Sequence, residues 1–308
     1  MVTAPAMALS TSPMFCATAP DLSVACSSSL AIASVVSLAV RTGVPFDHQR
    51  RQPFLRSPHM VALYEPINEY KPVAPNIGII DGPFEYLTVA GVRLPLPFTT
   101  RMTVVRLTNG DLFLHSPIKF DNRLANELQG FGTPRHLVSP NQFHYAHIGE
   151  WAKAFPAAIA WASPRVRERA RSRHIDIEFT RDLDAIPPEE WQREIDQTLF
   201  PGGYFKEFIF FHKASKTLIL TDTIINIELD KLTEPWRTAT KLTGMYHPHG
   251  QIFFGMRLPL LLQRRKAKAA LGKIHSWQPQ RILLSHGRCF DAHADEVIRR
   301  MFGEPHCE

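Results

Sequence analysis

Short apolar runs separated by turn residues dominate the chain from about Met60 onward. The runs at 77–80, 102–107 and 111–115 are rich in β-branched and large apolar residues, which predicts strands. The last two runs are joined by Thr108-Asn109-Gly110. An Asn-Gly pair between apolar runs favours a type I′ hairpin, because both residues tolerate a positive φ. The first part of the domain is therefore expected to be a β-meander.

Strand and helix patterns alternate after this meander. The pattern predicts strands over 136–139, 158–161, 207–212, 217–221 and 281–285, and helices over 122–128, 149–155, 229–242 and 258–273. A meander followed by alternating strands and helices is typical of an α/β domain. The last predicted helix carries the basic run Arg264-Arg265-Lys266, which favours a solvated helix face over an anion-binding role.

The composition changes near Met60. Residues 1–59 are rich in Ala, Ser, Thr and Pro, and contain two acidic residues. Three interpretations stay open: a transit-type peptide, a secretory signal, and sequence that precedes a true start at Met60. The lack of Lys or Arg before Arg41 argues against the secretory signal. We expect a disordered or targeting-like extension over 1–59 and one domain over 60–308, with a cytoplasmic location, or an organelle if the extension is a transit peptide.

Bulk composition excludes several classes of protein. With 44% hydrophobic and 21% charged residues, the 308-residue chain has an ordinary globular composition. Its formal charge of +6, from 35 basic and 29 acidic residues, is too mild an imbalance to predict a nucleic-acid partner. The longest apolar stretch, 30–40, is shorter than the roughly 20 residues that a transmembrane helix needs, so no transmembrane segment is expected. The sequence contains no Cys-x-x-Cys spacing, so a zinc knuckle is not predicted.

Three segments place histidine, aspartate and glycine after predicted strands. The first is 140–149, Pro-Asn-Gln-Phe-His-Tyr-Ala-His-Ile-Gly. The second joins 200–203, Phe-Pro-Gly-Gly, to 220–222, Leu-Thr-Asp, and the third is 283–287, Leu-Leu-Ser-His-Gly. Their order and spacing resemble the metallo-β-lactamase superfamily, which carries Thr-His-x-His-x-Asp-His-x-Gly, Pro-Gly-His, an aspartate and a late His-Gly at these places.

At a finer level the chain is similar to the family catalogued as domain of unknown function 4336, a divergent relative of that superfamily. The resemblance is carried by 64–66, 81–83, 101–107, 114–117, 210–222 and 285–288. It covers nearly everything after Met60 and implies an α/β fold of the αββα sandwich type, two mixed β-sheets flanked by helices. The family has no established reaction to carry over.

The resemblance also implies a metal site that has lost some of its ligands. Four of the seven ligand types are retained, at His144, His147, Asp222 and His286. The other three positions hold Gln142, Ala146 and Gly203. His147, Asp222 and His286 form the better surviving group, with His144 as a fourth ligand or an acid/base. Glu207 and His212 flank one predicted strand, and each is expected either to orient a ligand imidazole from behind or to make a structural hydrogen bond.

Three functions stay open on this basis. In the first, one zinc or iron ion serves a hydrolase-like reaction on a small ester, thioester or lactone, with His144 and Asp222 as the catalytic residues. In the second, the pocket holds no metal, catalyses nothing and binds a small molecule or a protein. The third is an oxidoreductase that uses iron at the same site. A small-molecule ligand is the expected partner. Serine-hydrolase, P-loop and dinucleotide-binding motifs are absent from the sequence.

Overall fold

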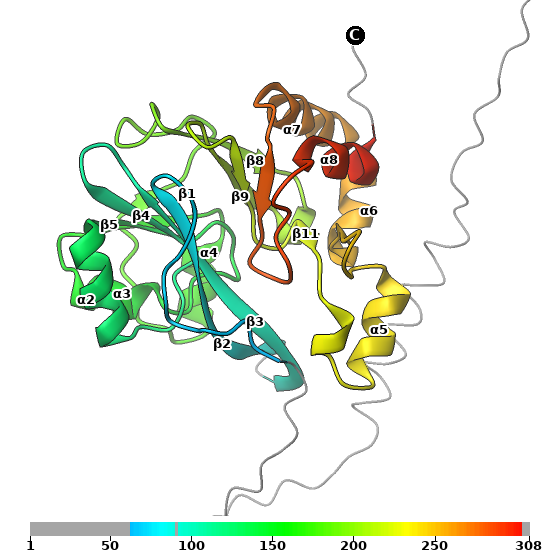
Figure 1. Cartoon of the computed structure of the whole chain (residues 1–308), viewed down its shortest axis with the longest axis horizontal. Helices are drawn as coiled ribbons and strands as arrows, with labels where there is room; N and C mark the ends of the chain where they lie inside the picture. The colour runs from blue at the N-terminus through cyan, green and yellow to red at the C-terminus, as the bar shows by residue number, and fades with distance from the viewer. Residues whose placement is uncertain (1–61, 90–91, 304–308) are drawn as a thin grey trace, which may run out of the picture. The chain divides into compact units, whose positions relative to one another are not determined.

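Two β-sheets lie face to face between two layers of helices (Figure 1). The structure, a computed structural model, describes residues 62–89 and 92–303, and all of them belong to one compact unit. The extension expected over 1–59 lies outside the described residues. None of the described helices is both long and apolar enough to cross a bilayer.

The first sheet contains seven strands in chain order. They are β1 (Lys71–Ala74), β2 (Ile77–Val89), β3 (Val92–Arg106), β4 (Asp111–His115), β5 (Thr133–Val138), β6 (Ile159–Ala162) and β7 (Arg181–Asp182). The strands β1 to β4 form the expected antiparallel meander, and β4 to β7 are parallel. Parallel neighbours need crossover connections. Three helices supply them: α2 (Asn122–Phe131), α3 (Ile148–Ala154) and α4 (Val166–Ser172).

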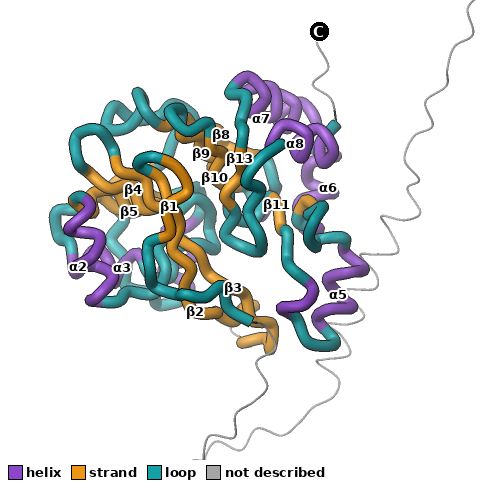
Figure 2. The backbone as a smooth tube through the Cα atoms, viewed as in Figure 1, coloured by secondary structure: helices purple, strands orange, loops and turns teal. Residues whose placement is uncertain are grey.

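The second sheet has the strand order β13-β10-β9-β8. Its strands are β8 (Ile195–Phe200), β9 (Glu207–His212), β10 (Thr217–Ile219) and β13 (Arg281–Leu283), and a separate pair is formed by β11 (Ile224–Ile225) and β12 (Gln251–Ile252). The remaining elements are η1 (Gly203–Phe205), η2 (Leu229–Lys231), α5 (Trp236–Thr243), α6 (Phe254–Leu262), α7 (Arg264–Ser276) and α8 (Ala294–Phe302). Figure 2 shows α2 and α3 on one side of the strands, and α7 and α8 on the other.

Alternating side chains along the strands build the three apolar layers. In β9, Phe208 and Phe210 enter the layer between the two sheets, whereas Ile209 and Phe211 pack toward α7 and α8. Because both faces of β9 are covered, its four inner residues, 208–211, form one continuous apolar run. The third layer lies between the first sheet and α2, α3 and α4. The predicted bounds of β4 and β9 are both confirmed.

The turn between β3 and β4 differs from the predicted type I′ form. Among the described turn residues, Gly110 has a positive φ of 88°, whereas Thr108 and Asn109 do not. The Gly110 N–H donates to the Leu107 carbonyl at 2.9 Å, and the Leu107 N–H donates to the Asp111 carbonyl at 2.8 Å. The connection is therefore a three-residue loop that ends in a left-handed glycine. The Asn109 side chain accepts from the Asp111 N–H, which holds the asparagine in this form.

Two predicted helices are each broken in two. The segment 229–242 forms η2 and then α5, because Pro235 disfavours a helical conformation in the residue before it. The segment 258–273 belongs to α6 and α7, which are separated at Gln263, whose φ of -112° and ψ of 35° are not helical. Because of the second break, α6 and α7 can point in different directions.

Candidate functional site

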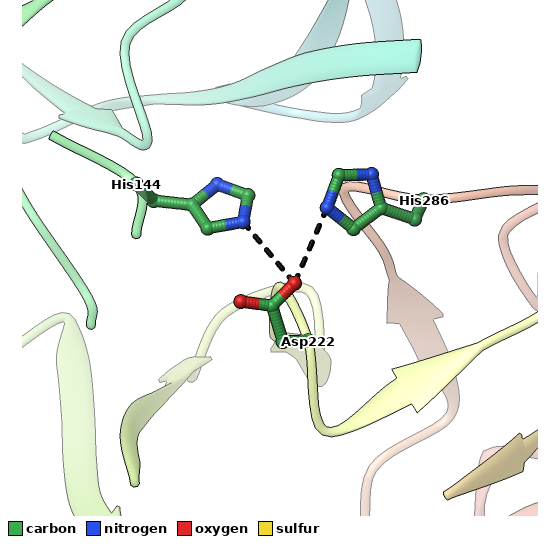
Figure 3. A group of neighbouring side chains, drawn as sticks. All are labelled: His144, Asp222 and His286. Carbon is green, nitrogen blue, oxygen red and sulfur yellow. Dashed lines mark hydrogen bonds and ion pairs between the residues drawn. The ribbon is translucent and has the colours of Figure 1, made fainter. Parts of the chain in front are cut away.

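Several loops meet at one edge of the two sheets. Because β10 and β13 are parallel they end side by side, and the antiparallel β9 begins there, at Glu207. The loop after β5 reaches the same place from the first sheet. This arrangement brings together His144, Asp222 and His286, from three segments far apart in the sequence (Figure 3).

The three side chains form a tight group. The Asp222 Oδ1 atom lies 3.3 Å from His144 Nε2 and 3.2 Å from His286 Nε2. Ligand atoms of all three residues lie within 4.8 Å of one another, and no other described His, Cys, Asp and Glu residues form such a group. The side chains are 11–16% exposed, so the group is partly accessible to solvent.

Hydrogen bonds behind the two imidazoles direct their Nε2 atoms at the carboxylate. The His286 Nδ1 atom lies 2.9 Å from the Thr99 carbonyl, which can only accept, so Nδ1 carries the hydrogen. The His144 Nδ1 atom lies 2.6 Å from Ser116 Oγ. A neutral His286 therefore turns a lone pair toward the Asp222 carboxylate. That contact is favourable only if a second proton or a metal cation lies between the two atoms.

Attraction between opposite charges outweighs burial in setting the pKa values of His144 and Asp222. Burial alone would lower the pKa of His144, but the Asp222 carboxylate outweighs it and the pKa of His144 is raised. Burial would likewise raise the pKa of Asp222, yet His144 and His286 hold it well below its usual range. Asp222 is therefore ionised at neutral pH and is a ready acceptor for a cation.

Asn141 connects the two loops that carry His144 and Asp222. Its Nδ2 donates to Asp222 Oδ2 at 2.7 Å and to Thr221 Oγ1 at 2.9 Å, and its Oδ1 accepts from the His144 N–H at 3.1 Å. Asn141 was not among the residues predicted from the sequence. A Pro-Asn pair directly after a strand could have indicated it, because an asparagine there commonly accepts from the backbone N–H groups that follow.

Glu207 lies beneath the Asp222 loop and not behind an imidazole. It is fully buried, and its Oε2 accepts from the N–H groups of Asp222 and Thr223 at 2.8 and 3.1 Å. It also accepts from the N–H and the hydroxyl of Thr221 at 3.0 and 2.9 Å. Glu207 therefore fixes the backbone that presents the Asp222 carboxylate.

The loop that carries His286 is held by a buried ion pair. Arg101 donates through Nη1 to the carbonyls of Leu284 and Gly287, both at 2.7 Å. Its Nε and Nη2 each lie 2.7 Å from Asp81 Oδ1, and both side chains are 4% exposed. Nothing in the sequence pattern pointed to this pair, because an Arg and an Asp on neighbouring strands are ordinarily exposed residues.

His147, predicted as a ligand, does not join the group. Its Nε2 lies 3.3 Å from Glu85 Oε1 and its Nδ1 lies 3.4 Å from Glu150 Oε2, without hydrogen-bond geometry in either case. His147 is the N-cap residue of α3, whereas His144 lies in the turn before the helix. The structure therefore reverses the expected ranking and places His144 beside Asp222 and His286.

His212, predicted to support a ligand, is remote from the group. It ends β9, whereas Glu207 begins that strand, and the ends of a six-residue strand are roughly 17 Å apart. Its Nδ1 lies 2.7 Å from Ser215 Oγ in the following turn. Of the two roles left open for His212, the structure shows the structural hydrogen bond, because the two ends of one strand cannot meet at one edge.

At two of the three positions that lack a ligand, the residue present makes or faces another contact. Gln142 is buried and its Nε2 donates to the Tyr204 carbonyl. Gly203 has a φ of 63°, and a Cβ atom there would lie 2.8 Å from Pro259 Cβ in α6. Ala146 is exposed. A histidine at position 203 would collide with α6, so the half of the site that Gln142 and Gly203 would supply is closed.

Two buried histidines make the stability of the domain pH-dependent. Burial lowers the pKa of His136 to about 4, and burial together with the nearby His144 lowers the pKa of His115 to about 3. At pH values between these pKa values and 6.5, the two histidines are protonated in the unfolded chain but neutral in the folded chain. The free energy of unfolding should therefore fall with decreasing pH by about 1.4 kcal/mol per pH unit for each histidine.

Denaturant titrations between pH 8 and pH 4 would measure this slope. A His136→Phe variant should lose one histidine's share of this slope. Its change in stability at pH 8, where the histidine is neutral in both states, reports packing together with the lost hydrogen bond from Trp161 Nε1. An unchanged slope in the variant would contradict the assignment to His136.

Comparisons with known proteins agree with this architecture. Residues 88–234 match the family model described as Domain of unknown function (DUF4336). Among solved structures, TMB-1 is 12% identical with a TM-score of 0.50, and the alignment covers 75% of this chain and 94% of that one. The mono-zinc form of the metallo-β-lactamase FIM-1 from Pseudomonas aeruginosa is 10% identical, with 75% and 91% covered and a TM-score of 0.50.

A metal-soaked flavodiiron core, Flv1 from Synechocystis sp. PCC6803, is 11% identical with a TM-score of 0.51, over 75% of this chain and 59% of that one. No curated protein matches the sequence. Identities this low show the fold alone. The predicted αββα sandwich and the resemblance to a divergent metallo-β-lactamase-fold family are confirmed.

Proposed function

We propose that this divergent relative of the metallo-β-lactamase fold holds one metal ion, zinc or iron, through His144, Asp222 and His286. The observation that carries the proposal is the convergence of two imidazole Nε2 atoms on one carboxylate oxygen, at 3.3 and 3.2 Å. His286 can turn only a lone pair toward that oxygen while it is neutral, because its Nδ1 donates to Thr99. Two imidazoles and a carboxylate are a donor set that suits both metals.

The closed half of the site favours one ion over two. Gln142 is engaged with Tyr204, and α6 occupies the space that a side chain at Gly203 would need. Three ligands leave a coordination position open, which is the arrangement of catalytic zinc sites. A bound metal would lower the pKa of a water molecule and polarise a carbonyl group there. We therefore propose hydrolysis of a small ester, thioester or lactone as the reaction.

The chain's own residues supply a rigid frame for that chemistry. Ser116 and Thr99 orient the two imidazoles from behind, and Asn141 and Glu207 hold Asp222 by its side chain and its backbone. Partners of this kind fix the tautomer and the direction of a ligand. The Phe98 ring, with its centroid 5.5 Å from that of His286, adds an apolar wall.

A metal-free binding pocket is the second candidate, and one observation favours it. The raised pKa of His144 means that a proton can satisfy the contact between His144 and Asp222 without a metal. In that case the group is a small charged cluster that binds a ligand and catalyses nothing. Metal content separates the two candidates.

Elemental analysis of the purified chain, after growth with zinc and with iron, is the decisive measurement. We expect about one metal ion per chain in the wild type and almost none in His286→Ala or Asp222→Asn, since three ligands cannot lose one without a large loss of affinity. His249→Ala is the matched control, because His249 is exposed in a His-x-His sequence outside the group. Metal-free, folded wild-type protein, or occupancy unchanged in His286→Ala, would refute the metal site. Ester and thioester hydrolysis is then assayed on the loaded protein.

A further inference from the structure

The helix α6 exposes a row of large apolar side chains. Phe254, Leu258, Leu261 and Leu262 are 38%, 64%, 55% and 78% exposed. Their spacing of four, seven and eight residues puts them on one face of the helix. The opposite face is already buried, with Met256 inaccessible to solvent and Leu260 packed against the layer under α7 and α8. Two faces of α6 are therefore apolar. The face with Met256 is buried in the domain, and the face with Leu258 is exposed.

The sequence segment that contains this row carries an excess of positive charge. Arg264, Arg265, Lys266 and Lys268 follow α6 directly and are all exposed. Between Glu234 and Asp291 the sequence holds ten Lys and Arg residues and no acidic residue. The rest of the chain contains the other 25 basic residues and all 29 acidic ones. The excess of positive charge therefore comes entirely from the segment that includes α5, α6 and α7.

Leucines bordered by cations match one kind of partner best. A nucleic acid would neutralise the cations but leave the leucines in water. A second copy of the chain, related by a two-fold axis, would bring one basic segment against another. The surface of an anionic bilayer takes up both kinds of group, because apolar side chains enter the interface while Lys and Arg meet the lipid phosphates.

We propose that α6 and the start of α7 dock on membranes that contain anionic lipids, with the exposed face of α6 in the interface. The helix that carries the docking face also contacts a segment beside the functional site. Pro259 of α6 lies against Gly203, and the next residue, Tyr204, is 45% exposed and accepts from Gln142. Docking would therefore hold the loop that carries His144 near the lipid surface.

Sedimentation of the full chain with lipid vesicles tests the proposal. We expect binding to an equal mixture of phosphatidylcholine and phosphatidylglycerol to be at least about tenfold tighter than to phosphatidylcholine alone, and to weaken as salt is added. The variant Leu258→Gln/Leu261→Gln/Leu262→Gln should lower the partition coefficient by about tenfold or more, because it removes the apolar contribution. Arg264→Glu/Arg265→Glu should lower it by a similar factor.

The matched control is Ile186→Gln, which removes an equally apolar side chain, 75% exposed, from a different surface segment and should leave binding unchanged. Thermal melting of each variant verifies that it is folded. The proposal is overturned if no vesicle binds, or if the leucine variant binds as well as the wild type. It is also overturned if that variant converts a dimer to a monomer while vesicles do not bind, which would assign the face to a second copy. Binding of an RNA oligonucleotide that depends on Arg264 and Arg265 but not on the leucines would assign it to nucleic acid.

Discussion

Arg101→Met is expected to lower the free energy of unfolding by about 3–5 kcal/mol, because it leaves a buried carboxylate without its main partner. Asp81 would keep one ion pair, to Lys71 at 2.8 Å, whose side chain is 27% exposed. The carbonyls of Leu284 and Gly287 would lose their donor at the same time. Urea denaturation measures the loss. Since these carbonyls flank His286, the metal content of the variant should fall as well.

The matched control for this substitution is Arg123→Met. Arg123 lies 3.9 Å from Glu69, but the two side chains are 65% and 48% exposed. An exposed pair of this kind contributes about 1 kcal/mol or less. If Arg123→Met and Arg101→Met destabilise the protein equally, the Arg101–Asp81 pair does not have the structural role assigned to it. The double variant Asp81→Asn/Arg101→Met should recover part of the loss, because it removes the unpaired charge.

Glu207→Leu is expected to destabilise the protein by about 3–5 kcal/mol, because three backbone N–H groups and one hydroxyl, buried or half-buried, lose their acceptor. These donors belong to Thr221, Asp222 and Thr223, so the loss is local to the loop that presents the Asp222 carboxylate. Denaturant titration measures the stability. Amide hydrogen exchange at the three residues should accelerate more than exchange in β9 itself.

Two further variants sharpen the test of Glu207. Glu207→Gln keeps the size of the side chain but turns an NH₂ group toward backbone donors, so it should also destabilise, though less than leucine. Glu194→Gln is the surface control, because Glu194 accepts from the Thr108 N–H at 3.0 Å in a turn, where water can replace it. A loss of about 1 kcal/mol or less is expected there. Unchanged exchange at Thr221–Thr223 in Glu207→Leu would show that Glu207 does not organise the loop.

Some features of the fold and the site follow from local sequence. The bounds of β9 and β4 were predicted to the residue, because burial on both faces of a sheet selects apolar side chains at the inner positions and polar residues mark the ends. His144, Asp222 and His286 were candidates because the resemblance to a known superfamily puts them at ligand positions after predicted strands. The expectation that these strand ends meet came from the resembled fold, and not from the local pattern.

Which candidate residues join the site depends on the direction in which each side chain points. That direction is set by packing against residues distant in sequence. His144 and His147 are three residues apart, yet the N-terminus of α3 sends His147 to Glu85 and Glu150. Asn141 and Glu207 acquire their roles only because β5, β9 and β10 end together. The sequence pattern of one segment does not predict which residues of another segment it will contact.

From the sequence, the periodicity of burial predicted the layers of strands and helices, and the resemblance to a known fold supplied the candidate ligands. The packing of distant segments settles the rest: which ligands meet, that α6 blocks a side chain at Gly203, and that the face of α6 with Leu258 has no cover among the described residues. The physical reason is that apolar residues such as Leu258 and Met256 have the same preference for burial. Which of them is buried depends on the packing of α6 against the rest of the domain.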